Sequence, residues 1–220
     1  DVYKRQIIFK YFDDSEIYSD MDYGVCVSFG AIFKADFING NAPIFNIHLS
    51  RLPELRGPSP VESAILNGNT LFGYTIFKIV EEVDEGPILY QNDVEVLDNY
   101  SSNVYEALLE DFIRSFKSID FKSPLQIQEG NVSVTSKFVK TDYMISKEDT
   151  IYEAKNKIKA FDILGPAYIQ YDSKIIKIHK YTEDNSDFKY ELKDGFLYLD
   201  DITPEGKKRM KASDYMRGLN

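Results

Sequence analysis

The sequence of this chain is poor in several residue types that build common kinds of site. It has one cysteine, two histidines and no tryptophan in 220 residues. A single cysteine, Cys26, excludes a disulfide within the chain. Cys26, His48 and His179 lie far apart in the sequence and do not form a cluster of metal ligands, so no metal site is expected.

Positively charged residues are also fewer than negatively charged ones. The chain has 26 lysines and arginines against 36 aspartates and glutamates, which gives a net charge of −10. Broad, non-specific binding of nucleic acid needs a cationic face, and this composition argues against one. A local basic patch remains compatible with it.

Long apolar runs and glycine-rich phosphate loops are missing as well. A membrane-spanning helix needs about 20 apolar residues in succession, and the sequence has no such stretch. We therefore expect no membrane association and a cytoplasmic protein. Hydrophobic residues still make up 43% of the chain, enough for the core of one large domain or two small ones.

The N-terminal part alternates between the patterns of strands and helices. Short apolar runs predict strands at residues 25–31, 44–49, 74–80 and 87–96. Apolar residues at helical spacing predict helices at residues 59–66 and 103–116. This alternation indicates an α/β fold whose sheet has parallel strands at its centre.

The C-terminal part has a different pattern. Residues 122–142 are polar, contain Pro124 and Gly130, and are interpreted as a linker. A helix at residues 150–161 is followed by a series of short strands with turn residues between them. We therefore predict a domain boundary near residue 140, with one domain at residues 7–140 and a small β-rich domain at residues 141–220.

Three polar residues follow the apolar runs of the first domain and suggest a catalytic site. Asn46 and His48 end one expected strand, and Asp84 opens a turn after the next. An amide can hold a carbonyl oxygen on which negative charge develops, and an imidazole can donate to that oxygen or move a proton. A carboxylate can orient the imidazole. These are the groups needed to transfer an acyl group to an amine.

The surrounding residues resemble one known family. The chain is similar to the formyl-tetrahydrofolate-dependent formyltransferases between about Tyr23 and Gln91, in the pattern Asn46-x-His48, Leu52-Pro53, Arg56-Gly57, Pro60, Gly73-x-Thr75, Asp84-x-Gly86 and Ile88. The resemblance implies a partial Rossmann-like formyltransferase domain followed by an OB-like C-terminal domain. The family's first strands have no counterpart here, which predicts an N-terminally truncated fragment. Residues 1–6 resemble a translated sequencing adapter and are expected to be an artefact.

The resemblance also implies roles for individual residues. Asn46 and His48 are expected to stabilise a tetrahedral oxyanion, and Asp84 to bind His48 and to relay or accept the proton of the amine. Formyl-tetrahydrofolate is expected as a co-substrate, with no tightly bound cofactor. The substrate-binding residues are expected to be Phe29, Gly30, Arg56, Gly57 and Pro60.

The acceptor of the formyl group stays open at this point. Lys207, Lys208 and Arg209 form the only concentrated positive charge, in a stretch similar to the C-terminal end of methionyl-tRNA formyltransferases. Initiator methionyl-tRNA is therefore the first candidate, and these three residues are its expected contacts. A nucleotide-linked amino sugar is the alternative, since the acidic chain suits a small acceptor. Glycinamide ribonucleotide is a third candidate, and an inactive fragment is a hypothesis of another kind.

Overall fold

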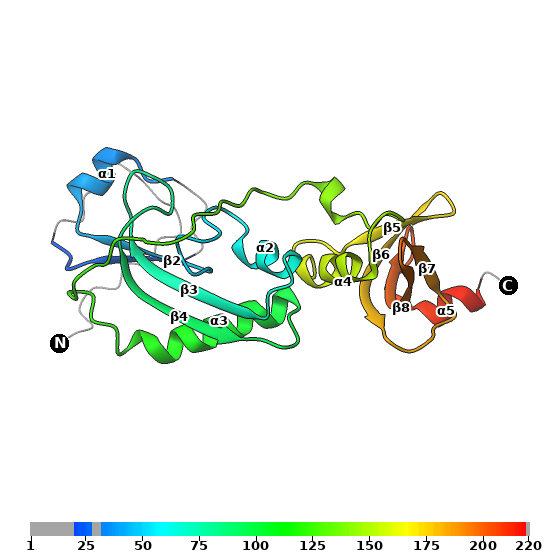
Figure 1. The fold of residues 1–220 in the computed structure, drawn as a ribbon. Coiled ribbons are helices and arrows are strands. Elements are labelled where there is room, and N and C mark those ends of the chain that lie inside the picture. Colours follow the sequence, from blue (N-terminus) through cyan, green and yellow to red (C-terminus); the bar gives the residue numbers. More distant parts are fainter. Residues whose placement is uncertain (1–19, 28–31, 219–220) are drawn as a thin grey trace.

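The computed structural model describes residues 20–27 and 32–218. Two sheets lie one after the other along the molecule, and the helices α2 (Pro60–Leu66) and α4 (Ile151–Ala160) pack against each other between them (Figure 1). Within the described residues, no helix is both long and apolar enough to cross a membrane.

The first sheet has the strand order β1-β2-β3-β4. Its strands are β1 (Gly24–Val27), β2 (Ile44–His48), β3 (Leu71–Lys78) and β4 (Ile88–Glu95). Strand β1 runs parallel to β2, but β3 and β4 are antiparallel to their neighbours. The chain thus forms the expected α/β fold, but the prediction of parallel strands at the centre of the sheet is wrong. A connection of only nine residues separates β3 from β4, and a parallel crossover needs a dozen or more.

Strand β3 lies in the interior of this sheet. Six successive residues from Phe72 to Phe77 are buried, so both faces of the strand are covered. The helix α3 (Ser101–Phe116) packs along β3 and β4 (Figure 1). The hydroxyl of Tyr74 donates to the Oδ2 atom of Asp111 on this helix at 3.0 Å, and a second bond to the same oxygen comes from Asn92 at 2.6 Å. The short helix α1 (Ala35–Gly40) connects β1 to β2.

The second sheet is antiparallel throughout. Its order is β5-β6-β8-β7, with β9 paired to β8. The strands are β5 (Tyr168–Tyr171), β6 (Lys174–Thr182), β7 (Lys189–Leu192), β8 (Gly195–Pro204) and β9 (Met210–Lys211). Asp172 and Ser173 form the turn between β5 and β6, both with positive φ, as two-residue hairpins prefer. The short helix α5 (Ala212–Arg217) packs against β8, and the short helix η1 (Lys140–Tyr143) precedes α4 in the chain.

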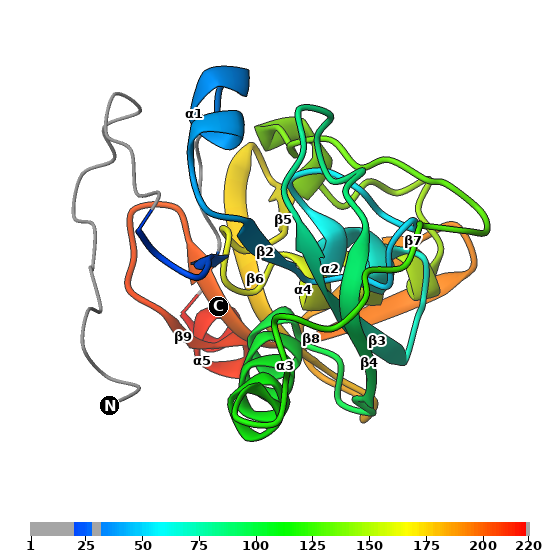
Figure 2. The same ribbon diagram turned by 90° about the vertical axis from the view of Figure 1, so that its left-hand side faces the viewer.

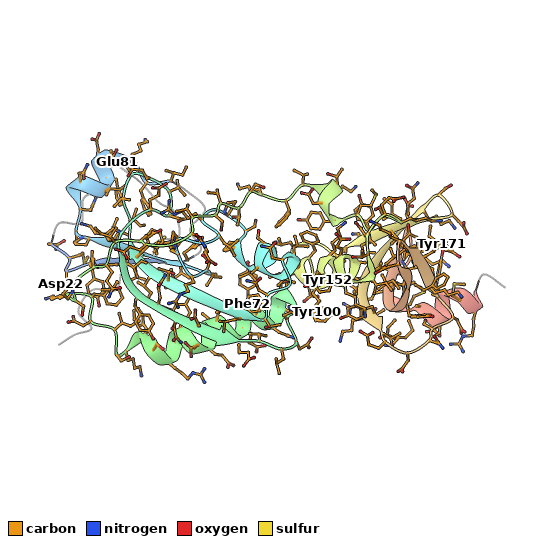
Figure 3. The ribbon with its side chains drawn as sticks, viewed as in Figure 1. Asp22, Phe72, Glu81, Tyr100, Tyr152 and Tyr171 are labelled. Carbon is orange, nitrogen blue, oxygen red and sulfur yellow. The ribbon has the colours of Figure 1, made fainter. Side chains whose placement is uncertain are left out.

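The helix α4 begins at a capping box. The Thr150 hydroxyl accepts a bond from the Glu153 backbone N–H, and the Glu153 carboxylate accepts one from the Thr150 N–H. Tyr152 of α4 and Tyr100, just before α3, lie between the two sheets (Figure 3). Lys159 of α4 donates to the side-chain oxygen of Asn99 at 2.9 Å. The packing of α2 against α4 and this polar contact therefore both join the C-terminal unit to the N-terminal one.

The segment between α3 and η1 is not a free linker, so that interpretation was wrong. Its residues 121–135 run back along the first sheet and are called the strap here. The Phe121 ring packs edge-on against Phe45 with centroids 5.2 Å apart, and the backbones of Gln126 and Ile88 exchange two hydrogen bonds. Figure 2, which views the molecule from the end of the first sheet, shows the green strap beside β3 and β4. A polar extended segment without apolar periodicity gave no indication of this pairing.

Candidate active site

Strand β2 presents two polar side chains on one face. Residues two apart in a strand point the same way, so Asn46 and His48 share a face while Phe45 and Ile47 point to the other. Phe45 and Ile47 belong to the hydrophobic core, with 2% and 5% of their surface exposed. Burial of these two side chains fixes the strand, and this aims Asn46 and His48 into one cavity.

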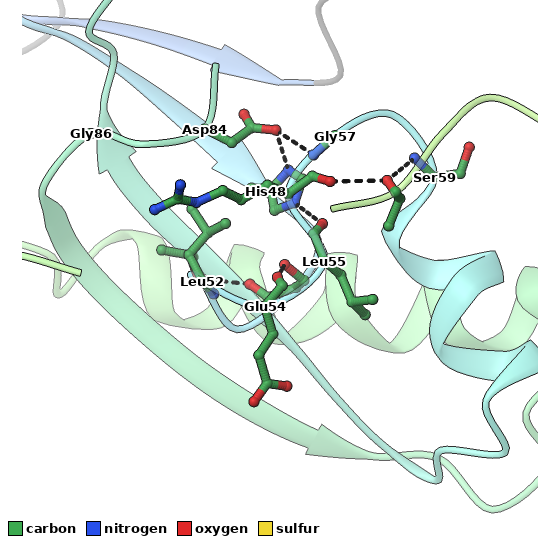
Figure 4. A network of polar contacts seen from close by, with 12 residues as sticks. His48, Leu52, Glu54, Leu55, Gly57, Ser59, Asp84 and Gly86 are labelled. Atoms are coloured by element: carbon green, nitrogen blue, oxygen red, sulfur yellow. Dashed lines mark hydrogen bonds and ion pairs between the residues drawn. The ribbon is translucent and has the colours of Figure 1, made fainter. Parts of the chain in front are cut away.

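His48 is buried, and both of its ring nitrogens have polar neighbours. The Nε2 atom lies 2.8 Å from the carbonyl oxygen of Leu55. The Nδ1 atom lies 3.6 Å from the Oδ2 atom of Asp84, slightly beyond hydrogen-bond length (Figure 4). A carbonyl oxygen can only accept, so Nε2 carries a proton and donates it to Leu55. Nδ1 is therefore the ring nitrogen that faces the carboxylate.

Asp84 is held by the loop that follows β2. Its Oδ2 atom accepts a hydrogen bond from the Gly57 backbone N–H at 2.8 Å (Figure 4). The residue has a φ of 57°, in the left-handed region that non-glycine residues seldom adopt. Gly57 has a φ of 108°, and a Cβ atom there would lie 2.7 Å from the carbonyl oxygen of Thr135. Glycine at position 57 thus allows the backbone to approach both the strap and Asp84.

Side chains of β3 and β4 hold the loop of residues 49–59 in place. The Thr75 hydroxyl donates to the carbonyl of Ser50 at 2.6 Å and accepts from the Leu52 N–H at 3.0 Å. Gln91 donates to the carbonyl of Leu52 at 2.7 Å. These bonds connect β3 and β4 to the loop, so the position of the Leu55 carbonyl against His48 depends on the sheet.

One cavity contains the three residues expected to be catalytic. Its volume is about 660 Å³. Asn46, His48 and Asp84 line it together with Gly57 and Pro60, which were expected to bind substrate. Further lining residues include Cys26, Phe33, Phe77, Glu81, Glu82, Tyr105 and Lys137. The three polar residues that follow apolar runs in the sequence therefore lie together in one cavity.

Arg56, which was also expected to bind substrate, lies outside this cavity. The Arg56 guanidinium points to Gln128 and to the Oε1 atom of Glu85, 3.0 Å away, and does not line the cavity. Phe29 and Gly30 fall outside the described residues. These expected roles stay predictions.

The expected tRNA contacts lie in the turn between β8 and β9. Lys207, Lys208 and Arg209 are exposed there. Two bonds of 2.9 Å join Arg209 to the carboxylate of Asp201, and the hydrogen bonds from Arg209 lower the pKa of Asp201. The Lys207 ammonium lies 5.2 Å from the centre of the Tyr215 ring. The charge of Arg209 is therefore already matched within the chain.

Sequence reasoning missed a buried carboxyl group behind the cavity. The Tyr105 ring lines the cavity, and its hydroxyl donates to Glu62 at 3.0 Å. Only 1% of Glu62 is exposed, and desolvation raises the pKa of its carboxyl above the ordinary value. The same burial raises the pKa of Tyr105. Glu62 falls on the apolar face of a short helix, where a charged residue would not be expected.

Lys137 and Gln128 were also missed, because both lie in the segment interpreted as a linker. Lys137 lines the cavity, whereas Gln128 is bonded to the turn that carries Asp84. Among the described residues, no group of three histidine, cysteine, aspartate or glutamate side chains is arranged to hold a metal ion.

Comparison with known proteins gives the family. A formyl transferase family model matches residues 13–115. Methionyl-tRNA formyltransferase of Thermosipho melanesiensis is 34% identical over 160 residues, which are 71% of this chain and 52% of that protein. The enzyme of the same name from a Wolbachia strain is 31% identical over 215 residues, 90% of this chain and 70% of that protein. This chain belongs to the formyltransferase family.

Solved structures of formyltransferases share the fold. The methionyl-tRNA formyltransferase of Clostridium thermocellum superposes with a TM-score of 0.64 at 18% identity, over 88% of this chain and 79% of that one. WlaRD, a sugar 3N-formyltransferase solved in the presence of dTDP and 5-N-formyl-tetrahydrofolate, gives a TM-score of 0.60 at 21% identity, over 84% and 73%. The chain spans about half the length of the first curated relatives that it matches, between 46% and 57%.

Proposed function

We propose that this formyltransferase chain carries the catalytic groups for transfer of a formyl group from formyl-tetrahydrofolate to a primary amine. The observation that carries the proposal is the shared cavity, where Asn46, His48 and Asp84 meet and the His48 Nδ1 atom lies 3.6 Å from the Asp84 carboxylate. Family membership supports the reaction class. Formyl-tetrahydrofolate acts as a co-substrate that enters and leaves.

The reaction is a transfer between two nitrogens. The amine attacks the formyl carbon, a new carbon–nitrogen bond forms, and the carbonyl oxygen becomes an oxyanion. Asn46 donates to this oxyanion, and His48 does so through Nδ1 when that atom carries a proton. The carbon–nitrogen bond to the folate then breaks, and the proton lost by the amine passes through the His48–Asp84 pair to the folate nitrogen.

The proposed acceptor is the amino group of initiator methionyl-tRNA. The names of the relatives at 34% and 31% identity favour it, as does the basic turn at Lys207 and Lys208. In this proposal residues 7–140 form the catalytic domain, and residues 141–220 form an OB-like domain that supports the tRNA. The antiparallel order β5-β6-β8-β7 is compatible with a barrel of that kind.

A nucleotide-linked amino sugar is the second candidate. WlaRD, which has a similar fold, is a sugar formyltransferase, and the net charge of −10 suits a small acceptor. Formation of formyl-methionyl-tRNA and of a formylated sugar nucleotide, each measured with formyl-tetrahydrofolate as the donor, distinguishes the two. Product with the sugar alone would overturn the tRNA assignment.

Replacement of His48 tests the proposed reaction itself. His48→Ala should lower kcat by roughly 100- to 1,000-fold, the usual effect of losing one donor to an oxyanion. His179→Ala is the matched control, since His179 bonds to Thr203 in the C-terminal sheet and should leave the rate unchanged. Full activity in His48→Ala would contradict the enzymatic assignment for any acceptor.

A further inference from the structure

The side-chain amide of Gln128 joins the strap to the turn that carries Asp84. Its Nε2 atom donates to the carbonyl oxygens of Asp84 and Gly86, both at 2.8 Å. Its Oε1 atom accepts from Arg56, at 3.2 Å from Nε and 2.8 Å from Nη2. Both N–H groups and both lone pairs of the amide are thus used.

The chemistry of these partners fixes which way the amide points. A guanidinium can only donate and a backbone carbonyl can only accept. The amide oxygen must therefore face Arg56, and the amide nitrogen must face the Asp84 turn. Arg56 also binds Glu85 at 3.0 Å, so it contacts the same turn directly. The turn is held from two sides by one arginine–glutamine pair.

This turn needs an external restraint because its backbone is unfavourable. Asp84 has a φ of 57°, which a non-glycine residue adopts at a cost in free energy. Gly86 packs so closely that a Cβ atom there would lie 1.7 Å from the Lys78 carbonyl oxygen. Bonds to the carbonyls on either side of Glu85 keep the Asp84 Cα–Cβ bond aimed at Gly57 and His48.

The strap itself is anchored on both sides of Gln128. The Ile88 and Gln126 backbones exchange bonds of 2.7 and 2.8 Å. Further along, the Arg56 N–H donates to Ser133 at 2.9 Å, and Thr135 donates to the Arg56 carbonyl at 2.6 Å. Gln128 therefore lies between two hydrogen-bonded segments of the strap, and these restrain its backbone on both sides.

We propose that Gln128 is a positioning residue: oriented by Arg56, it holds the Asp84 turn so that the Asp84 carboxylate faces His48. Gln128 does not line the cavity, so it acts through Asp84 without touching the substrate. Its effect on catalysis rests on the proposed function. Its effect on the His48–Asp84 geometry is a property of the protein alone.

The test compares Gln128→Ala and Gln128→Glu with the control Gln126→Ala. The glutamate variant keeps an acceptor for Arg56, which preserves the fold, but it loses both N–H donors to the turn. Gln126 lies on the same strap with an exposed side chain, and its alanine variant keeps the backbone bonds to Ile88. The primary measurement is the ¹⁵N NMR signals of the histidine rings, which requires no substrate. Only His48 and His179 contribute, so a His48→Gln sample assigns them.

In both Gln128 variants the His48 ring signals should move, while the His179 signals and the Gln126→Ala spectrum stay unchanged. In the transfer assay kcat should fall by about 10- to 100-fold, as expected when a catalytic group is misplaced by about 1 Å, with KM little altered. Unchanged His48 signals in folded Gln128→Glu would overturn the proposal. An active His48→Ala protein would overturn the proposed function instead, so the two failures are distinguishable.

Discussion

The Nε2 atom of His48 donates to the carbonyl oxygen of Leu55 over 2.8 Å, which leaves only Nδ1 to face Asp84. An unprotonated Nδ1 opposite an ionised carboxylate would bring two acceptors together at 3.6 Å. The arrangement is favourable when the pair holds one proton, on either the imidazole or the carboxyl group. This geometry is the basis of the proposed proton transfer through His48 and Asp84.

Removal of the carboxylate charge should stop this proton transfer without disturbing the loop. In Asp84→Asn the amide oxygen still accepts from the Gly57 N–H, so the melting temperature should stay close to that of the unsubstituted chain. We expect kcat to fall by at least about 100-fold, since an acid–base group typically contributes 10²–10⁴-fold. Steady-state rates and a thermal melt measure the two effects. Asp93→Asn is the control, because Asp93 pairs with Arg51 at the surface, and equal losses in both variants would contradict this role.

The basic turn between β8 and β9 gives a prediction about tRNA. If tRNA phosphates bind there, changing Lys207 and Lys208 together to glutamine should reduce the slope of log affinity against log salt by about two units, roughly one per lost contact. Arg209→Gln should have a smaller effect, because two hydrogen bonds already bind Arg209 to Asp201. Binding of methionyl-tRNA at several salt concentrations measures the slopes. With a sugar nucleotide as the acceptor, the lysine changes should be silent, and an unchanged tRNA slope would exclude this contact.

The buried Glu62 carboxyl should make stability depend on pH. Desolvation raises its pKa, so the folded chain binds this proton more tightly than the unfolded chain. The resulting stabilisation is complete below the ordinary value of 4.5 and is lost as the pH rises through the raised pKa. Glu62→Gln should therefore raise Tm at neutral pH. In a chain of this size, each kcal/mol gained in the free energy of unfolding raises Tm by about 2–4 °C. Its amide oxygen can still accept from Tyr105.

Thermal melts of Glu62→Gln between acidic and neutral pH check this sign. The gain should disappear in acid, where both side chains are neutral. Glu106→Gln is the control, since Glu106 is an exposed carboxyl on α3 and should show no such trend. An increase in Tm of equal size at all pH values would show that protonation of Glu62 does not cause the stabilisation.

Two glycines with similar φ angles allow the cost of the positive φ to be separated from the cost of a steric contact. Gly57 has a φ of 108° and Gly130 has a φ of 115°, but a Cβ atom meets Thr135 only at Gly57. Alanine at either position carries the cost of a positive φ, roughly 1 kcal/mol or more. Gly57→Ala should lose more stability than Gly130→Ala in urea unfolding. It should also lose activity, because relief of the Thr135 contact would displace the backbone N–H that donates to Asp84. Equal behaviour of the two variants would show that the Thr135 contact is unimportant.

Sequence periodicity determined most of the secondary structure. Alternating burial in β2 placed Asn46 and His48 on one face of a strand, and that relation depends only on the geometry of an extended chain. The strands β2 to β4 and the helices α2 to α4 lie within a few residues of the expected ranges. The short helices α1 and α5 were not expected, since two turns provide too few residues for a clear period.

The tertiary structure alone decided how these elements serve the site. Arg56 and Gln128 are 72 residues apart in the sequence, and neither residue type specifies the other as its partner. The side-chain bonds of Gln128 and the backbone pairing of its strap form only when the sheet brings residues 53–59 and 84–88 close to residues 126–135. Local patterns along a chain record which face a residue occupies. They do not record which distant polar group will meet it, because that depends on the packing of the whole sheet.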